Sequence, residues 1–205
     1  MAGRSRSTAP TETDTADRIV DGAIRAAEAY GLRRLTMDQI AKHTNIARVT
    51  IYSHFPNKDA VITAAVAREL ESLLIRVQSV ESGLKDPYER FVEMFTAAFG
   101  WLRDNALLQR LIRFEPETIL PYAAYDSPYL AIGRQWVASQ LADMFQETAP
   151  ASTPSDFDDT AELVVRVVQS LVLSPMSEYD LNDANSLREL ARRWLLPTLP
   201  RHLSA

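Results

Sequence analysis

The apolar residues of this chain recur at spacings of three and four from Asp14 onward, and proline, asparagine or glycine interrupts each recurrence. Such spacing puts apolar side chains on one face of an α-helix, so each uninterrupted stretch predicts an amphipathic helix. A half-buried β-strand would instead alternate apolar and polar residues between turn signals, and no stretch of this sequence does so. We therefore expect the 205-residue chain to be all-α, with about nine helices.

Helix ends can be placed from capping residues. After an arm over residues 1–13, rich in Ser, Thr, Arg and Pro and expected to be disordered, a helix over 14–30 stops at Gly31. Thr36 and Gln39 have capping-box spacing and open the second helix. The remaining helices are expected at about 37–43, 48–54, 58–81, 87–103, 105–114, 128–148, 156–173 and 183–196.

Two stretches of the sequence predict irregular structure. Residues 116–127 contain Pro116 and Pro121 and lead into Pro128, so we expect one helical turn there at most. Residues 149–155, with two prolines, are expected to form a loop.

Composition excludes several classes of site. The chain has no cysteine, which rules out disulfides, thiolate metal sites and cysteine nucleophiles. No apolar run approaches the roughly 18 residues of a membrane span, and the N-terminus lacks the apolar core of a signal peptide, so a cytoplasmic protein is expected. No glycine-rich phosphate loop, catalytic carboxylate pair or histidine cluster stands out. We therefore expect no catalytic residue, metal or cofactor.

Charge is unevenly distributed along the chain. The formal net charge is −5, yet residues 31–58 contain five basic residues and one acidic residue, a local charge of +4. A small basic patch on an acidic protein indicates local contact with a polyanion, although fluctuations of this size are common.

Residues 35–59 have the spacing of a helix-turn-helix: two short helices around a tight turn, then a long helix. The apolar residues expected to hold the pair together are Ile40, Ala41, Ile46, Ile51 and Phe55, while Arg48, Val49, Thr50, Tyr52, Ser53 and His54 are left to face outward. A short outward-facing helix of this composition can enter the major groove of DNA. Many helical proteins that bind no DNA also expose such a helix, so spacing alone leaves both interpretations open.

The same segment resembles the DNA-binding domain of the TetR family of transcriptional regulators. The resemblance covers roughly residues 14–62, about a quarter of the chain. The positions that match the family pattern are Thr36, Ile40-Ala41, Thr50-Ile51-Tyr52, His54-Phe55 and Lys58-Asp59. It implies a helix-turn-helix domain over residues 14–58 and a helical ligand-binding and dimerisation domain over 59–205.

The resemblance also implies roles for individual residues. Those at phosphate-contacting positions are Thr36, Tyr52, His54 and Lys58, and those at base-reading positions are Arg48, Val49 and Thr50, with Arg48 the candidate for guanine. The sequence departs from the family where a glycine is usual in the turn (Asn45), at the cap of the second short helix (Ala47), and at Val49. Because of these departures the family pattern does not identify the operator sequence, but the expected mode of binding is unchanged.

For the second domain the resemblance implies a small-molecule site and a dimer surface. Candidates to line an apolar ligand pocket are Phe91, Phe95, Phe99, Arg113, Phe114, Tyr122, Trp136 and Gln140, although aromatic residues at helical spacing are also typical of a core. Candidates for the dimer surface are Leu163, Val164, Val167, Val168, Leu171, Leu187, Leu190, Ala191, Trp194 and Leu195, with burial inside one chain as the alternative.

Taken with the resemblance, the sequence predicts a ligand-responsive transcriptional regulator. We expect a homodimer that binds a palindromic operator in double-stranded DNA and is released by a small, mostly apolar effector, with repression as the family's usual outcome. An enzyme and a purely structural helical dimer are the alternative classes, and specific binding to DNA in the presence of competitor DNA would separate them.

Overall fold

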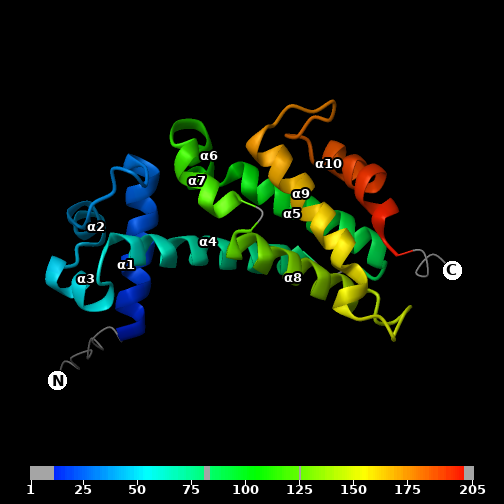
Figure 1. Cartoon of the computed structure of the whole chain (residues 1–205), viewed down its shortest axis with the longest axis horizontal. Helices are drawn as coiled ribbons and strands as arrows, with labels where there is room; N and C mark the ends of the chain where they lie inside the picture. The colour runs from blue at the N-terminus through cyan, green and yellow to red at the C-terminus, as the bar shows by residue number, and fades with distance from the viewer. Residues whose placement is uncertain (1–11, 81–83, 125, 201–205) are drawn as a thin grey trace, which may run out of the picture. The chain divides into compact units, whose positions relative to one another are not determined.

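The computed structural model describes residues 12–80, 84–124 and 126–200, and within these ranges the chain forms helices and turns without a strand (Figure 1). The predicted all-α fold is confirmed, and the described ranges contain ten α-helices in place of about nine. The chain divides into two compact units, residues 1–69 and 70–205, and the boundary falls inside helix α4 (Lys58–Val80). Most of the expected arm, and position 81 at the expected end of the long helix, lie outside the described residues. No helix of the described chain is both long and apolar enough to cross a membrane.

The first unit contains α1 (Glu12–Tyr30), α2 (Met37–Thr44), α3 (Arg48–His54) and the beginning of α4. Helix α1 begins two residues before the predicted start and stops where predicted, at Gly31, whose φ of 81° is easily adopted only by glycine. The capping box is also confirmed. Gln39 N donates to Thr36 Oγ1 at 3.2 Å, and Thr36 N donates to Gln39 Oε1 at 2.8 Å.

Helices α1 and α2 approach closely at one glycine. A Cβ at position 22 would stand 2.0 Å from Cγ2 of Thr44. Thr44 is buried, and its hydroxyl donates to the carbonyl of Ile40 at 3.0 Å, so its side chain is held in one rotamer. Ile40 and Ile51 are fully buried in the same unit, so a packed core holds the helix pair in place.

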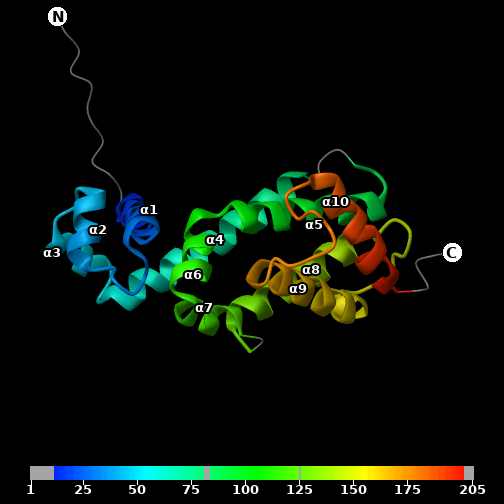
Figure 2. The same cartoon turned by 90° about the horizontal axis from the view of Figure 1, so that it is seen from above.

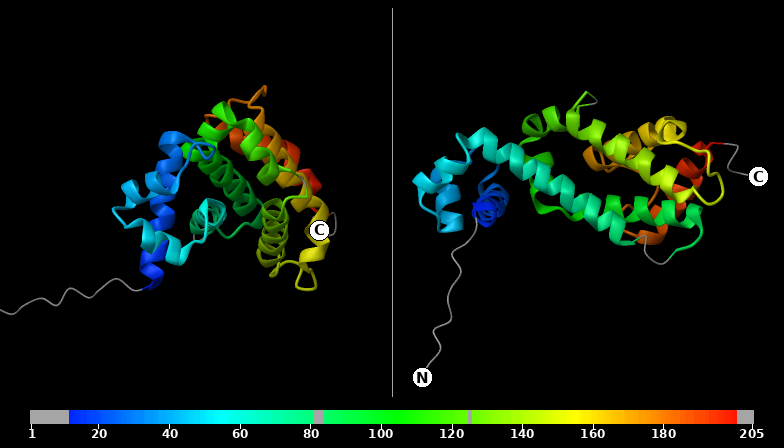
Figure 3. Two further views of the ribbon diagram at one scale, coloured as in Figure 1. Left: turned by 60° about the vertical axis from the view of Figure 1, so that its left-hand side comes forward. Right: turned by 90° about the horizontal axis from the view of Figure 1, so that it is seen from below.

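The second unit is built on α5 (Pro87–Asp104), α6 (Ala106–Phe114), α7 (Pro116–Ala123), α8 (Pro128–Met144), α9 (Asp158–Leu173) and α10 (Ala184–Leu190). Helix α8 runs beside α9, and α5 runs beside α10, as Figures 2 and 3 show from above and below. The largest side chains fully buried between them are Phe99, Leu141, Phe145, Phe157, Leu187, Leu190 and Leu195. Asp86 caps α5 by accepting the amide of Tyr88, and Ser127 caps α8 by accepting the amide of Tyr129.

Three expectations about this unit need correction. Residues 116–123 form helix α7, because Pro116 occupies the first turn, where no N–H is needed, and Pro121 removes only one hydrogen bond. Helix α8 ends at Met144, four residues early. The last helix is not regular throughout: α10 continues as a π-helical turn over Ala191–Leu195 and then a 3₁₀ turn over Leu196–Thr198.

Candidate nucleic-acid interface

Helix α3 buries one side and exposes the other. Ile51 is fully buried, whereas Val49 is 76% exposed and Tyr52 is 45% exposed. Arg48 and Ser53 are also exposed, and Thr50 and His54 are half-buried. The outward ridge expected from the sequence is therefore present. An apolar β-branched side chain as open to solvent as Val49 has apolar surface available to a partner.

The turn between α2 and α3 forms without the usual glycine. Asn45 adopts φ 54°, in the left-handed region that asparagine tolerates well. The amide of Ile46 donates to Thr44 Oγ1 at 3.2 Å and ties the turn to the end of α2. Ala47 occupies the cap of α3 and makes no side-chain hydrogen bond, as its residue type requires.

Arg48 is held by two neighbours. Its Nη1 lies 2.9 Å from Oδ1 of Asp38 in the first turn of α2, and its guanidinium carbon lies 6.0 Å from the centroid of the Tyr52 ring. Hydrogen bonding with Tyr52 and the charge of Asp38 raise the pKa of Arg48. Sequence reasoning missed Asp38, whose only signal was its opposite charge ten residues before Arg48.

Three of the four residues proposed to contact phosphate lie at helix ends, and the fourth, Tyr52, lies within α3. Thr36 is the exposed cap of α2, His54 ends α3, and Lys58 begins α4. Asn57 caps α4 through its Oδ1, which accepts from the amide of Ala60 at 2.9 Å. Backbone amides at such helix starts, together with a lysine, favour anions.

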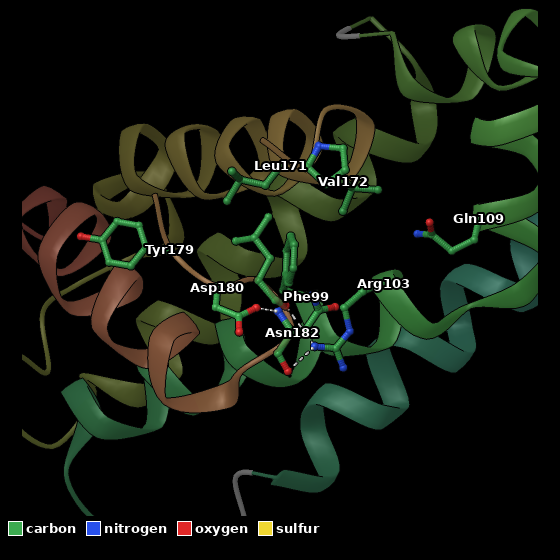
Figure 4. A pocket seen from close by; sticks show the side chains of 10 residues that line it. Phe99, Arg103, Gln109, Leu171, Val172, Tyr179, Asp180 and Asn182 are labelled. Carbon is green, nitrogen blue, oxygen red and sulfur yellow. Dashed lines mark hydrogen bonds between the residues drawn. The ribbon is translucent and has the colours of Figure 1, made fainter. Parts of the chain in front are cut away.

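The residues proposed to bind a ligand differ in how far they are buried. Phe91, Phe95 and Phe99 are buried in the core of the second unit, and Phe114 is 61% exposed, with the guanidinium groups of Arg110 and Arg113 over its ring. Arg113 is exposed, and Tyr122, Trp136 and Gln140 are half-buried. Phe99 lines a cavity of about 230 Å³, whose other lining residues were not selected from the sequence for a ligand site (Figure 4).

The residues proposed for the dimer surface divide into two groups. Six are buried in the core of their own unit, which corrects the expectation for them: Val164, Leu171, Leu187, Leu190, Ala191 and Leu195. Leu163 and Trp194 are 43% and 44% exposed, and Val167 and Val168 are half-buried. The apolar stripes therefore serve mainly the chain's own core, and the surface open to a second copy is narrower than expected.

Comparisons with known proteins agree with this interface. Residues 19–65 match the family model described as bacterial regulatory proteins, tetR family. The chain is 29% identical over 175 residues to the uncharacterised HTH-type transcriptional regulator Rv1255c of Mycobacterium tuberculosis, covering 85% of this chain and 83% of that protein. It is 26% identical over 160 residues to the HTH-type transcriptional repressor Rv1353c of the same organism, covering 78% of this chain and 57% of that protein.

The fold matches that of solved structures. The multidrug binding protein EbrR, in complex with imidazole, superposes with a TM-score of 0.61 at 22% identity, over 97% of this chain and 98% of that one. At this identity the likeness establishes a shared fold.

Proposed function

Because the chain belongs to the TetR family and is a DNA-binding transcriptional regulator, we propose that it represses transcription by binding a palindromic operator as a homodimer, and that a small molecule releases it. The observation that carries the proposal is the ridge of α3, with Ile51 buried beneath it and Arg48, Val49 and Tyr52 exposed. A ridge of this size fits the major groove.

The chemistry of the ridge suits base recognition. The guanidinium of Arg48 has the geometry to donate two hydrogen bonds to O6 and N7 of guanine. The methyl groups of Val49 and Thr50 suit contact with the methyl group of thymine. We assign base reading to these three residues.

Phosphate contacts are assigned to the residues around the ridge. The hydroxyls of Thr36 and Tyr52 and the imidazole of His54 can donate to phosphate oxygens, and Lys58 adds a positive charge at the start of α4. These contacts would fix the register of α3 on the duplex without selecting a sequence.

The homodimer is proposed to form through the exposed parts of α9 and of the last helical segment. Leu163 and Trp194 supply the largest exposed apolar side chains there. Two copies would present two α3 helices to half-sites one DNA turn apart. Sedimentation should show Leu163→Arg shifted toward monomer. Leu120→Arg, at a 60% exposed residue of α7 outside the proposed surface, should stay dimeric.

Two similar proteins support the proposals that the chain represses transcription and that a small molecule releases it from DNA. One relative is named a repressor, and one structural neighbour is a multidrug binding protein complexed with imidazole. An effector that prefers the conformation with low DNA affinity would release the operator by linkage. Because the operator belongs to the chromosome, we also propose that the protein acts in the cytoplasm.

The test begins with selection of bound sequences from random double-stranded DNA, followed by fluorescence anisotropy with excess competitor DNA. We expect an enriched palindrome, with affinity at least about a thousandfold above that for unrelated DNA. Enrichment of no sequence would contradict the operator proposal, and enrichment of a single half-site would contradict the dimer.

A further inference from the structure

A cavity of about 230 Å³ lies in the second unit between the end of α5, α6, the end of α9 and the loop that follows α9 (Figure 4). We call it the Phe99 cavity. Apolar side chains form part of its wall, namely Phe99, Leu171, Val172, Pro175 and Leu181. A cavity of this size suits a ligand of about one ring, since a cavity of roughly 150 Å³ can hold benzene.

The polar wall of the Phe99 cavity contains one basic and one acidic side chain, Arg103 and Asp180, and the charge of Arg103 is already paired outside the wall. Arg103 is the one basic residue among those that line it, and its Nε and Nη2 donate to the Asp104 carboxylate at 2.7 and 2.8 Å. This pairing lowers the pKa of Asp104, which keeps the carboxylate ionised opposite the guanidinium. The charge of Asp180 also helps to raise the pKa of Arg103, but Asp104 supplies both printed carboxylate hydrogen bonds to that guanidinium, so Asp180 is the carboxylate left to face the cavity. The sequence between Arg166 and Arg188 contains three acidic residues and no lysine or arginine.

The polar wall of the cavity offers a ligand two acceptor atoms, on Asp180 and Gln109. Nη1 of Arg103 donates to the carbonyls of Leu181 and Asn182 at 3.0 and 3.2 Å, so most of its N–H groups are already used. Asp180 accepts the amide of Asn182 at 2.9 Å through Oδ1, which holds its carboxylate in place and leaves Oδ2 for a ligand. Gln109 donates through Nε2 to the carbonyl of Leu102 at 3.2 Å, and its Oε1 stays available as an acceptor.

We propose that the Phe99 cavity binds a small organic cation, a protonated amine attached to an apolar body of about one ring. The ammonium group would bond Oδ2 of Asp180, and the ring would lie against Phe99, Leu171 and Val172. Building on the function proposed above, we assign this ligand class to the effector. The mostly apolar effector expected from the sequence is thereby replaced by a cation.

The cavity is one side chain away from the surface proposed for the dimer. Tyr179 lines the cavity, and its ring meets that of Trp194 edge-on, with 5.5 Å between centroids. Trp194 is 44% exposed. A ligand that moves the loop at Tyr179 would therefore alter the support of a residue in the proposed dimer contact.

The binding test uses no DNA. Benzylamine, which is protonated at neutral pH, is titrated into the full chain and followed by NMR chemical shifts of the loop and of the Trp194 indole. We expect saturable binding with a dissociation constant of roughly millimolar order, typical of so small a ligand. Benzyl alcohol, of the same shape without charge, should bind at least about tenfold more weakly, and benzoate more weakly still.

A pair of variants locates the site. Asp180→Asn keeps an oxygen that can accept a hydrogen bond from the Asn182 amide, so the loop should still fold. The substitution should weaken the binding of benzylamine at least about tenfold and leave the binding of benzyl alcohol unchanged. Asp143→Asn, at an exposed carboxylate of α8 outside the cavity, should change neither. Equal weakening in both variants, equal binding of the alcohol and the amine, or no saturable binding would overturn the cavity proposal. A thermal melt of each variant confirms that it is folded.

The proposal that the cavity binds a cation and the proposal that the protein is a regulator can be contradicted independently. If benzylamine binds through Asp180 but leaves operator affinity unchanged at saturation, the assignment of this ligand class to the effector is overturned while the binding site stands. If no operator is found, the function proposed above fails, and the NMR result still decides whether the cavity binds cations.

Discussion

The guanidinium of Arg48 and the carboxylate of Asp38 form an ion pair of 2.9 Å between exposed side chains of α3 and α2. Arg48 is the residue assigned to guanine, so this pair must loosen, or carry its carboxylate toward DNA, when the operator binds. In the absence of DNA, Asp38 holds the Arg48 side chain in a defined position, but it also places a negative charge in the proposed DNA interface.

We expect Asp38→Asn to increase DNA affinity about twofold to fivefold for operator and unrelated DNA alike. An exposed ion pair is weak, so the effect is modest, and the substitution removes both the competing partner of Arg48 and its repulsion of phosphate. Anisotropy titrations of both duplexes measure the change. Glu28→Gln, an equal charge change at an exposed site on α1, serves as control. A fall in operator affinity instead would mean that Asp38 aims Arg48 at its base.

Arg48 and Lys58 should respond differently to truncation. Arg48→Ala should cost about 1–3 kcal/mol of discrimination at one base pair of each half-site, because it removes a bidentate hydrogen bond to a base. Lys58→Ala should weaken all sequences and reduce the slope of log affinity against log salt by about 0.9 for each phosphate that is no longer neutralised. Titrations at several salt concentrations on matched and single-mismatch operators separate the two effects. Identical behaviour of both variants would contradict the division into base-reading and phosphate-binding residues.

Gly22→Ala should destabilise the first unit by about 1–2 kcal/mol, despite a gain of about 1 kcal/mol in helix propensity. The added Cβ would meet Cγ2 of Thr44 at 2.0 Å, and Thr44 cannot turn away without breaking its buried hydrogen bonds. Urea denaturation measures the change. Gly133→Ala is the matched control, since nothing lies within 4 Å of a Cβ there, and it should be neutral or stabilising by up to about 1 kcal/mol. A stabilising Gly22→Ala would show that the two helices can separate slightly at no cost.

Helices α5 and α10 are joined by a paired charge that should matter for stability. Arg188 donates from Nε to Glu93 Oε1 at 2.6 Å and from Nη2 to Oε2 at 3.1 Å, and the two side chains are 30% and 23% exposed. This hydrogen bonding with Glu93 raises the pKa of Arg188. Glu93→Gln should lower the free energy of unfolding by about 1–3 kcal/mol, because it leaves a half-buried cation poorly paired.

The control for this prediction lies one turn earlier on the same helix. Glu89 pairs with Arg192 at 2.7 Å, but both side chains are more than two fifths exposed, at 43% and 45%. Glu89→Gln should therefore cost less than about 1 kcal/mol. Urea denaturation of both variants gives the comparison, and equal costs would show that burial does not set the strength of these pairs.

Local features of the fold were predictable from sequence because their causes are local. The capping box of Thr36 and Gln39 depends on two residues three apart. The positive φ values at Gly31 and Asn45 follow from their residue types. The exposed ridge of α3 was predictable for the same reason, since one buried residue, Ile51, determines which side of a seven-residue helix turns outward.

Features that depend on a distant partner were not predictable. Periodicity identifies an apolar face but not what covers it, so Leu187 and Leu190 were assigned to a dimer surface although their own unit buries them. Phe114 was assigned to a pocket and is exposed, and the loop that completes the Phe99 cavity carries no pattern of its own. The pair of Arg48 and Asp38 joins two helices across a turn, which spacing along one helix does not reveal.

The π-helical turn over Ala191–Leu195 makes the end of the chain sensitive to length. A π turn accommodates an extra residue within an α-helical path, and each residue of an α-helix turns the chain by about 100°. Across this turn Ala191 and Leu195 are buried and Trp194 is 44% exposed. Deleting one residue from this turn would restore a regular helix and rotate the residues that follow about the helix axis. Leu195 and Leu199 would then lose their buried positions. The number of residues in this segment, more than their identity, therefore determines whether Leu199 reaches its buried position.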